Sequence, residues 1–161
     1  MRTRSDAATA RGPVSTGNFK RVGLVLALAA ATPAIALDFR SVAPPAAVLY
    51  DAPSLKARKL FILNQGYPVE ILVSLEGWLK VRDASGELAW IEAKNLSTQH
   101  SVMVKVPRGE VRRAPDENAP IVFLVEQDGL LDVIETADNW VHVRHRDGST
   151  GYIRITQVWG L

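Results

Sequence analysis

The sequence of 161 residues contains no cysteine. This absence excludes disulfide bonds, thiolate metal ligands, a cysteine nucleophile and lipid attachment through a cysteine. Histidine, the side chain suited to acid–base chemistry near neutral pH, occurs only at His100, His142 and His145. The folded protein must therefore be stabilised by the packing of apolar side chains.

Recognisable catalytic motifs are also missing. The sequence has no Gly-x-Ser-x-Gly elbow, no glycine-rich phosphate loop and no paired-carboxylate motif. His142 and His145 are three residues apart in a segment with a period of two. They therefore point to opposite faces of a strand and do not pair as metal ligands. We expect a protein that is not an enzyme and that binds neither a metal nor a cofactor.

Positive charge is concentrated at the N-terminus. The first 36 residues hold five of the 19 basic residues and one of the 17 acidic residues. The rest of the chain keeps 14 basic and 16 acidic residues, a net charge of −2. Because a nucleic-acid-binding protein needs a basic surface, nucleic acid is not an expected partner.

Residues 1–36 have the order of a secretory signal peptide. A basic segment ending in Lys20 and Arg21 precedes the apolar run 22–31, and Ala34 and Ala36 occupy the −3 and −1 positions of a cleavage site. The apolar run is shorter than the ~20 residues of a membrane-spanning helix. We expect cleavage after Ala36 and export to the periplasm or the medium, without a stable membrane span. An uncleaved membrane anchor is the alternative.

Two segments 62 positions apart repeat one pattern. The segments are residues 77–91 and 139–153. In each one the second residue is a tryptophan, Trp78 or Trp140, and the last two residues are an aromatic residue and an isoleucine. Apolar and polar residues alternate after each tryptophan, and a glycine-containing turn follows, as in a β-hairpin. The same offset aligns the flanking apolar positions and turns without a gap, which predicts a duplicated all-β domain.

The repeat sets the expected domain boundaries. We assign residues 37–47 to an extended lead-in before the fold, because Pro44 and Pro45 disfavour regular structure there. The first domain is assigned to residues 48–97 and the second to residues 98–161. Residues 102–106 are expected to form a strand that links the two domains.

The order of motifs in each copy resembles the bacterial SH3-like (SH3b) domain. The resemblance rests on Val-Arg-x-Ala-Pro at 111–115, Val-Glu-Ile-Leu at 69–72, Gly-Trp-Leu-Lys-Val-Arg at 77–82, and Ala-Trp-Ile at 89–91 or Gly-Tyr-Ile at 151–153. It covers essentially the whole chain after residue 36 and implies two tandem small β-barrels. The chain thus resembles small exported proteins with two such domains. This resemblance implies binding of peptides, cell-wall material or protein partners.

The pattern of eukaryotic SH3 domains is only partly present. Residues 48–51 resemble the start of the motif that opens those domains, but Ala52 replaces its final tyrosine. The following loop is basic, with Lys56, Arg58 and Lys59, where the eukaryotic loop is acidic. Recognition of proline-rich peptides, which needs an aromatic-lined groove, is therefore not expected.

Aromatic residues are the best candidates for a site. Strand parity places Trp78 and Trp90 on the face opposite Leu79, and Trp140 and Tyr152 take the same positions in the second copy. Such rings either bind a ligand, because they offer large contact area at little entropic cost, or cover the sheet and contact the other domain. The candidate ligand-contacting residues are Tyr50, Trp78, Trp90, Trp140, Tyr152 and Trp159.

These observations predict a non-enzymatic binding or scaffolding protein of the bacterial envelope. Its expected partner is peptide, cell-wall material or an envelope protein, with both copies contacting one ligand. One alternative is a structural assembly partner that has no small ligand and uses its tryptophan faces for association. A more remote alternative is an uncharacterised hydrolase.

Overall fold

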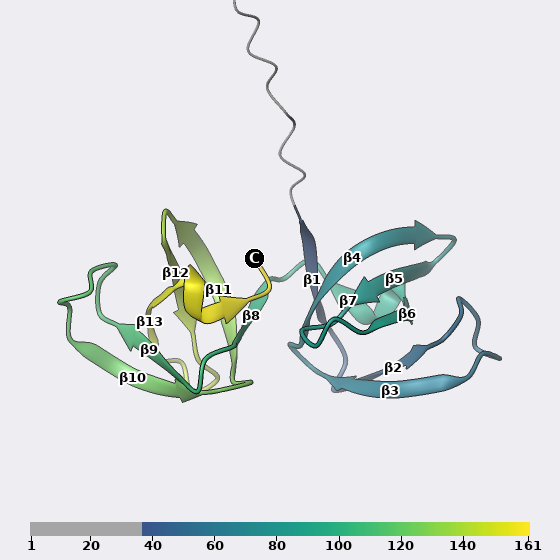
Figure 1. Cartoon of the computed structure of the whole chain (residues 1–161), viewed down its shortest axis with the longest axis horizontal. Helices are drawn as coiled ribbons and strands as arrows, with labels where there is room; N and C mark the ends of the chain where they lie inside the picture. The colour runs from purple at the N-terminus through teal and green to yellow at the C-terminus, as the bar shows by residue number, and fades with distance from the viewer. Residues whose placement is uncertain (1–36) are drawn as a thin grey trace, which may run out of the picture. The chain divides into compact units, whose positions relative to one another are not determined.

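The computed structural model describes residues 37–161, which lie in one compact unit. The expected signal peptide, with Ala34 and Ala36, lies outside the described residues. The fold is all-β and contains two seven-stranded antiparallel sheets, which we call the first module (residues 38–97) and the second module (residues 101–160) (Figure 1). Within the described part of the chain, no helix has the length and apolar character needed to cross a membrane.

The sheet of the first module has the strand order β3-β2-β6-β5-β4-β1-β7. Its strands are β1 (Asp38–Val42), β2 (Ala46–Tyr50), β3 (Lys59–Asn64), β4 (Pro68–Leu75), β5 (Trp78–Arg82), β6 (Leu88–Glu92) and β7 (Leu96–Ser97), with a short 3₁₀ turn η1 (Ala93–Asn95) before β7.

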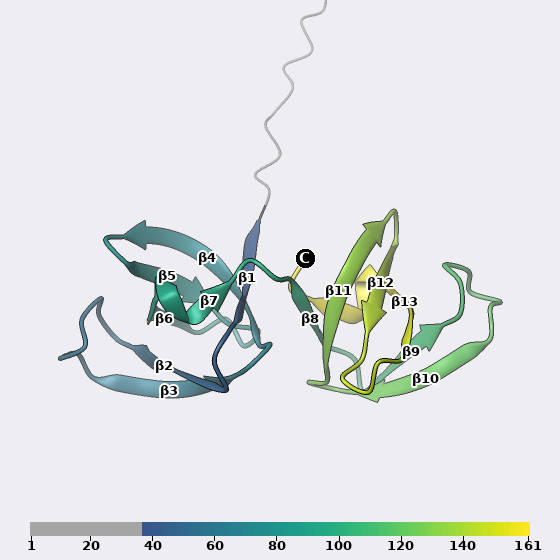
Figure 2. The same cartoon turned by 180° about the vertical axis from the view of Figure 1, so that it is seen from behind.

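The second module repeats this topology in the order β10-β9-β13-β12-β11-β8-β14 (Figure 2). Its strands are β8 (Ser101–Val104), β9 (Arg108–Arg112), β10 (Ile121–Glu126), β11 (Leu130–Ala137), β12 (Trp140–Arg144), β13 (Thr150–Arg154) and β14 (Val158–Trp159), with η2 (Ile155–Gln157) before β14. Each strand of the second module occupies the same place in its sheet as its counterpart in the first module, for example β12 and β5. The duplication predicted from the sequence is therefore confirmed.

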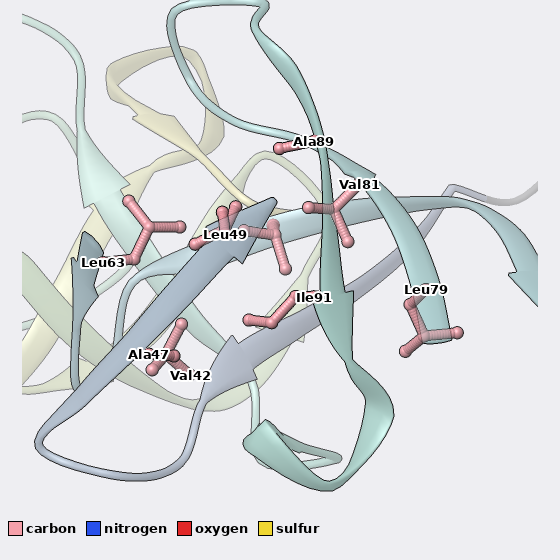
Figure 3. Close-up of a cluster of buried hydrophobic side chains, with 9 residues drawn as sticks. Val42, Ala47, Leu49, Leu63, Leu79, Val81, Ala89 and Ile91 are labelled. Atoms are coloured by element: carbon pink, nitrogen blue, oxygen red, sulfur yellow. The ribbon is translucent and has the colours of Figure 1, made fainter. Parts of the chain in front are cut away.

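Each module buries one face of its sheet in a core of aliphatic side chains. On β5, Leu79 and Val81 are only 4% and 0% exposed, and they pack with Leu49 and Ile91 from β2 and β6 (Figure 3). Residues at the same repeat positions, including Val143 on β12, form the core of the second module. The alternation of the sequence therefore predicted the inward faces of these strands correctly.

The segment 37–47, expected as a lead-in before the fold, instead contributes β1 and the start of β2. β1 pairs with both β4 and β7, and it buries Phe39 and Val42. Its counterpart β8 belongs to the sheet of the second module and is not merely a linking strand. Both strands are short and are held by partners distant in the sequence, so local periodicity did not identify their role.

Residues of β1 and β8 also join the two modules within this compact unit. Ser41 and Ser101 are both buried, and the Ser101 backbone N–H donates a hydrogen bond to Ser41 Oγ at 3.0 Å. The Ser101 hydroxyl donates to the carbonyl of Gly66. Nearby, the ring of Trp159 meets Phe39 edge-to-face at 5.0 Å between centroids. The buried hydroxyl groups are therefore satisfied, as groups removed from water must be.

Tyr67 lies between β3 and β4, where it is partly covered by neighbouring residues. Burial raises the pKa of its phenol above the usual 10.0, because the phenolate is poorly solvated there. A hydrogen bond with the backbone of Ala84 acts in the opposite direction, and the charges of Asp83 and Asp128 add to the rise.

Candidate functional site

A tight turn between β4 and β5 places Leu75 opposite Trp78 in the first module. Glu76 and Gly77 both have positive φ, 37° and 86°, as the central residues of a type I′ hairpin turn do. On its other side β5 pairs with β6, and there Trp78 lies opposite Glu92. Two residues further, Lys80 lies opposite Trp90.

Three aromatic side chains meet on this surface, which we call the first aromatic face (Tyr50, Trp78, Lys80, Trp90 and Glu92). Tyr50 of β2 lies opposite Trp90 in the strand register. Its ring contacts Trp78 edge-to-face, with 5.4 Å between centroids and an angle of 87°. Tyr50 is buried, whereas both tryptophans keep part of their surface accessible. The structure thus brings together the three candidate residues of the first copy.

The rim of the first aromatic face is polar. Glu92 forms an ion pair with Lys94 at 2.8 Å, and Lys80 is the cross-strand neighbour of Trp90. Accessible rings with charged groups at their edge can stack on an apolar or ring-shaped part of a ligand while the rim contacts its polar groups. This combination suits a peptide or a saccharide.

The second module carries a different set of side chains at the matching positions. Trp140 of β12 lies opposite Arg154 of β13, and the Arg154 guanidinium lies 5.1 Å from the centre of the Trp140 ring. Glu117 forms an ion pair with Arg154. Trp140 is therefore only 8% exposed although it points away from the core. A cation–π contact covers a ring that the sequence pattern correctly placed on the outer face.

The remaining aromatic candidate of this face is also engaged by its own chain. Tyr152 stacks on His142 with 4.5 Å between ring centroids and an angle of 11°. The His142 Nδ1 lies 3.6 Å from a carboxylate oxygen of Glu135. At the position of Tyr50 the second module has Arg112, which pairs with Glu110. The second face is thus a surface of ion pairs and stacked rings.

A cavity of about 310 Å³ adjoins Trp140 on this second face. Two arginines and two glutamates contribute to its lining, so their formal charges cancel. The lining residues are Glu110, Arg112, Glu117, Trp140, Arg154 and Gln157.

Trp159 lies apart from both faces. It packs on Phe39 and lines a groove of about 670 Å³ together with Tyr67 and Met103. Its surroundings indicate a role in joining the modules, and it is not brought together with the other five candidates.

A second groove, of about 570 Å³, is mainly polar and includes Ser41, Ser101 and His145 among its lining residues. The two serine hydroxyl groups are hydrogen bonded to each other. His145 pairs through Nδ1 with Asp147 at 3.2 Å. The pKa of Asp147 is lowered, mainly by a hydrogen bond from the backbone of Ser149 and then by one from the Ser149 side chain. His145 acts in the same direction. Among residues 37–161 no serine hydroxyl is hydrogen bonded to a histidine ring, and no three potential metal ligands cluster.

Sequence reasoning missed the charged residues that cover the second face. Arg154 replaces Glu92, Arg112 replaces Tyr50 and Glu117 replaces Leu55 when the copies are aligned at the offset of 62. These differences were visible in the aligned repeats. That they converge on one tryptophan, however, depends on strand pairing between segments far apart in the chain.

The comparisons with known proteins agree with this architecture. The family described as bacterial SH3 domain matches the chain twice, over residues 43–98 and 105–160. The chain therefore belongs to the bacterial SH3 domain family and carries two tandem copies of the domain. No curated protein matches the chain significantly.

Three similar solved structures are NlpC1 and NlpC2 from Trichomonas vaginalis and an NlpC/P60 family protein from Bacillus cereus ATCC 10987. Sequence identities are 20%, 20% and 15%, and the matches cover 84%, 77% and 76% of this chain. They cover 50%, 48% and 56% of those proteins, so this chain spans about half their length. The TM-score is 0.36 in each case, and a likeness this weak carries no argument about activity.

Proposed function

We propose that this protein is a non-enzymatic binding or scaffolding protein of the bacterial envelope, and that it holds peptide or cell-wall material on the first aromatic face. One observation carries the proposal: Trp78 and Trp90 are partly accessible on one face of a sheet, supported by the buried ring of Tyr50. Rings supported in this way present a preformed contact surface, and little conformational freedom is lost when a ligand binds.

Comparison of the two modules supports the choice of the first face. The second module covers its equivalent tryptophan with Arg154, whereas the first module has Glu92 at that position. Glu92 is engaged by Lys94 at the rim. Trp78 thus keeps part of its surface accessible, whereas Trp140 is buried. We assign ligand contact to the first module and a stabilising role to the covered face of the second.

Binding to purified cell-wall sacculi and to a peptide array tests this assignment. We expect Trp78→Ala and Trp90→Ala to abolish binding of the wild-type ligand. Leu72→Ala is the matched control, because Leu72 is an exposed apolar residue of β4 outside the first aromatic face. Binding through ring contacts should persist in high salt, whereas binding through exposed lysines and arginines should be screened. Wild-type protein that binds neither material would favour the structural assembly partner.

Export is the part of the proposal that concerns residues 1–36. The apolar run and the small residues at Ala34 and Ala36 support cleavage before Leu37. Intact-mass measurement of protein from the envelope fraction should give a chain that begins at Leu37. Full-length protein confined to the cytoplasm would contradict export while leaving the binding assay unaffected.

A further inference from the structure

β3 and β10 are edge strands of their sheets. Among the strand pairs of the described residues, β3 pairs only with β2 and β10 pairs only with β9 (Figures 1 and 2). The backbone on the other side of each strand therefore has no strand partner among residues 37–161. Such an edge can pair with a strand of another molecule.

Both edges expose apolar side chains at matching repeat positions. On β3, Leu60 and Ile62 are 38% and 62% exposed, and on β10 Val122 and Leu124 are 44% and 47% exposed. A strand edge that is both unpaired and apolar on its outer face is suited to association.

A β-bulge limits how much of each edge is regular. The register with the neighbouring strand shifts around Leu60 in β3 and around Val122 in β10. Residues 61–64 and 123–126 remain as regular segments. Bulges at an edge restrict pairing to short, well-matched partners, so the selectivity must come from the side chains at the ends of these segments.

The charges at the two edges are opposite. Exposed Lys56 and Lys59 lie before and at the start of β3, and exposed Glu126 and Asp128 lie at and after the end of β10. None of these four residues takes part in an ion pair among residues 37–161. We call β3 with its two lysines the basic edge, and β10 with its two carboxylates the acidic edge.

We propose that the basic edge of one copy pairs with the acidic edge of a second copy as antiparallel strands, with Ile62 opposite Leu124. Antiparallel pairing brings the start of one strand to the end of the other. In this register Leu60 lies opposite Glu126 and Lys59 lies opposite Gln127, so Lys59 of one copy and Glu126 of the next are diagonal neighbours. Ile62 and Leu124 cover each other. Opposite charges and apolar side chains across an antiparallel pair both stabilise it.

The charges favour this pairing over pairing of like edges. Two antiparallel copies of β3 would place each Lys59 near Asn64, and two copies of β10 would place each Glu126 near Val122. Neither arrangement brings opposite charges together. Because each copy carries one basic and one acidic edge, the contact is head-to-tail and continues from copy to copy. This inference concerns a surface other than the first aromatic face and does not depend on the proposed function.

Sedimentation velocity of the purified protein tests the pairing. Between micromolar and millimolar concentration we expect the wild-type mass to rise above that of one chain at low salt, and to fall back as salt screens the edges. A protein that remains monomeric over this range would overturn the proposal.

Charge exchange identifies the surface. The double variant Lys56→Glu, Lys59→Glu has two acidic edges, and the double variant Glu126→Lys, Asp128→Lys has two basic edges. We expect each variant alone to be monomeric and an equimolar mixture of the two to associate again. Association of either variant alone at the wild-type level, or a mixture that stays monomeric, would refute pairing of these edges.

A single substitution tests the apolar part of the contact. We expect Ile62→Lys to abolish association. Val73→Lys is the control, because Val73 is 48% exposed on β4, outside both β3 and β10, and lies opposite Lys80 of β5. Circular dichroism confirms that both variants are folded. Equal loss of association in the two variants would show that another apolar surface is responsible.

Discussion

Replacing Trp78 or Trp140 by alanine removes the same side chain from the same repeat position of two modules. The two rings nevertheless have different surroundings. Trp140 is 8% exposed beneath the guanidinium of Arg154, whereas Trp78 remains partly accessible and contacts Tyr50 through a ring edge. The structure therefore predicts a loss of stability for one variant and a loss of binding for the other.

The burial of each ring gives the expected magnitudes. Truncating a nearly buried tryptophan costs ~3–5 kcal/mol, so Trp140→Ala should destabilise the protein by about this amount. In a domain of 60–100 residues each kcal/mol lowers the melting temperature by ~4–8 °C, so the fall should exceed ~10 °C. For Trp78→Ala, the edge-to-face contact with Tyr50 contributes ~0.5–1.5 kcal/mol, and the accessible part of the ring contributes little to stability.

Thermal melting and sacculus binding, measured on the same preparations, separate the two effects. Trp78→Ala should lower the melting temperature by less than Trp140→Ala does, and it should lose binding. Trp140→Ala should melt much earlier, yet retain binding at temperatures where it is folded. Loss of binding in Trp140→Ala at those temperatures would instead support the expectation from the sequence that both copies contact one ligand.

The reverse pattern would refute the reasoning. If Trp78→Ala lowered the melting temperature as much as Trp140→Ala and left binding intact, the first aromatic face would be structural. If Arg154→Ala left the stability unchanged, the cation–π contact would not explain why Trp140 is covered.

Three further predictions concern stability. Val81→Asp places an unpaired charge in the core and should cost several kcal/mol in urea denaturation, whereas Lys80→Glu on the opposite face should change the free energy of unfolding by less than ~0.5 kcal/mol; the reverse ranking would contradict the assigned faces. A Cβ added at Gly151 would lie 2.7 Å from a backbone oxygen of β9, whereas a Cβ added at Gly109 would meet side-chain methyl groups at 2.9 and 3.1 Å. Because side chains move more easily than backbone, Gly151→Ala should lower the melting temperature more than Gly109→Ala. Because the native state holds the phenolic proton of Tyr67 more tightly than the unfolded chain does, its contribution is intact below pH 10.0 and is lost as pH rises through its raised pKa; denaturation across alkaline pH should show a smaller loss for Tyr67→Phe.

Local patterns in the sequence determined much of the architecture. Alternation around Leu79 and Val81 identified the inward face of β5, and the offset of 62 identified the duplication. Both signals are local because successive side chains of a strand point to opposite sides, so a few residues define which face is buried. For the same reason the outward position of Trp78 and Trp140 was predictable from the sequence.

Only the tertiary structure decided what covers each outward ring. Arg154 reaches Trp140 from the neighbouring strand, and Glu117 reaches Arg154 from a distant loop. No period in the sequence encodes that meeting. The same holds for β1, whose five residues become a strand because β4 and β7 pair with it. The face of a strand to which a side chain points follows from the alternation of neighbouring residues. The exposure of a ring or of a strand edge depends instead on which remote segment lies beside it.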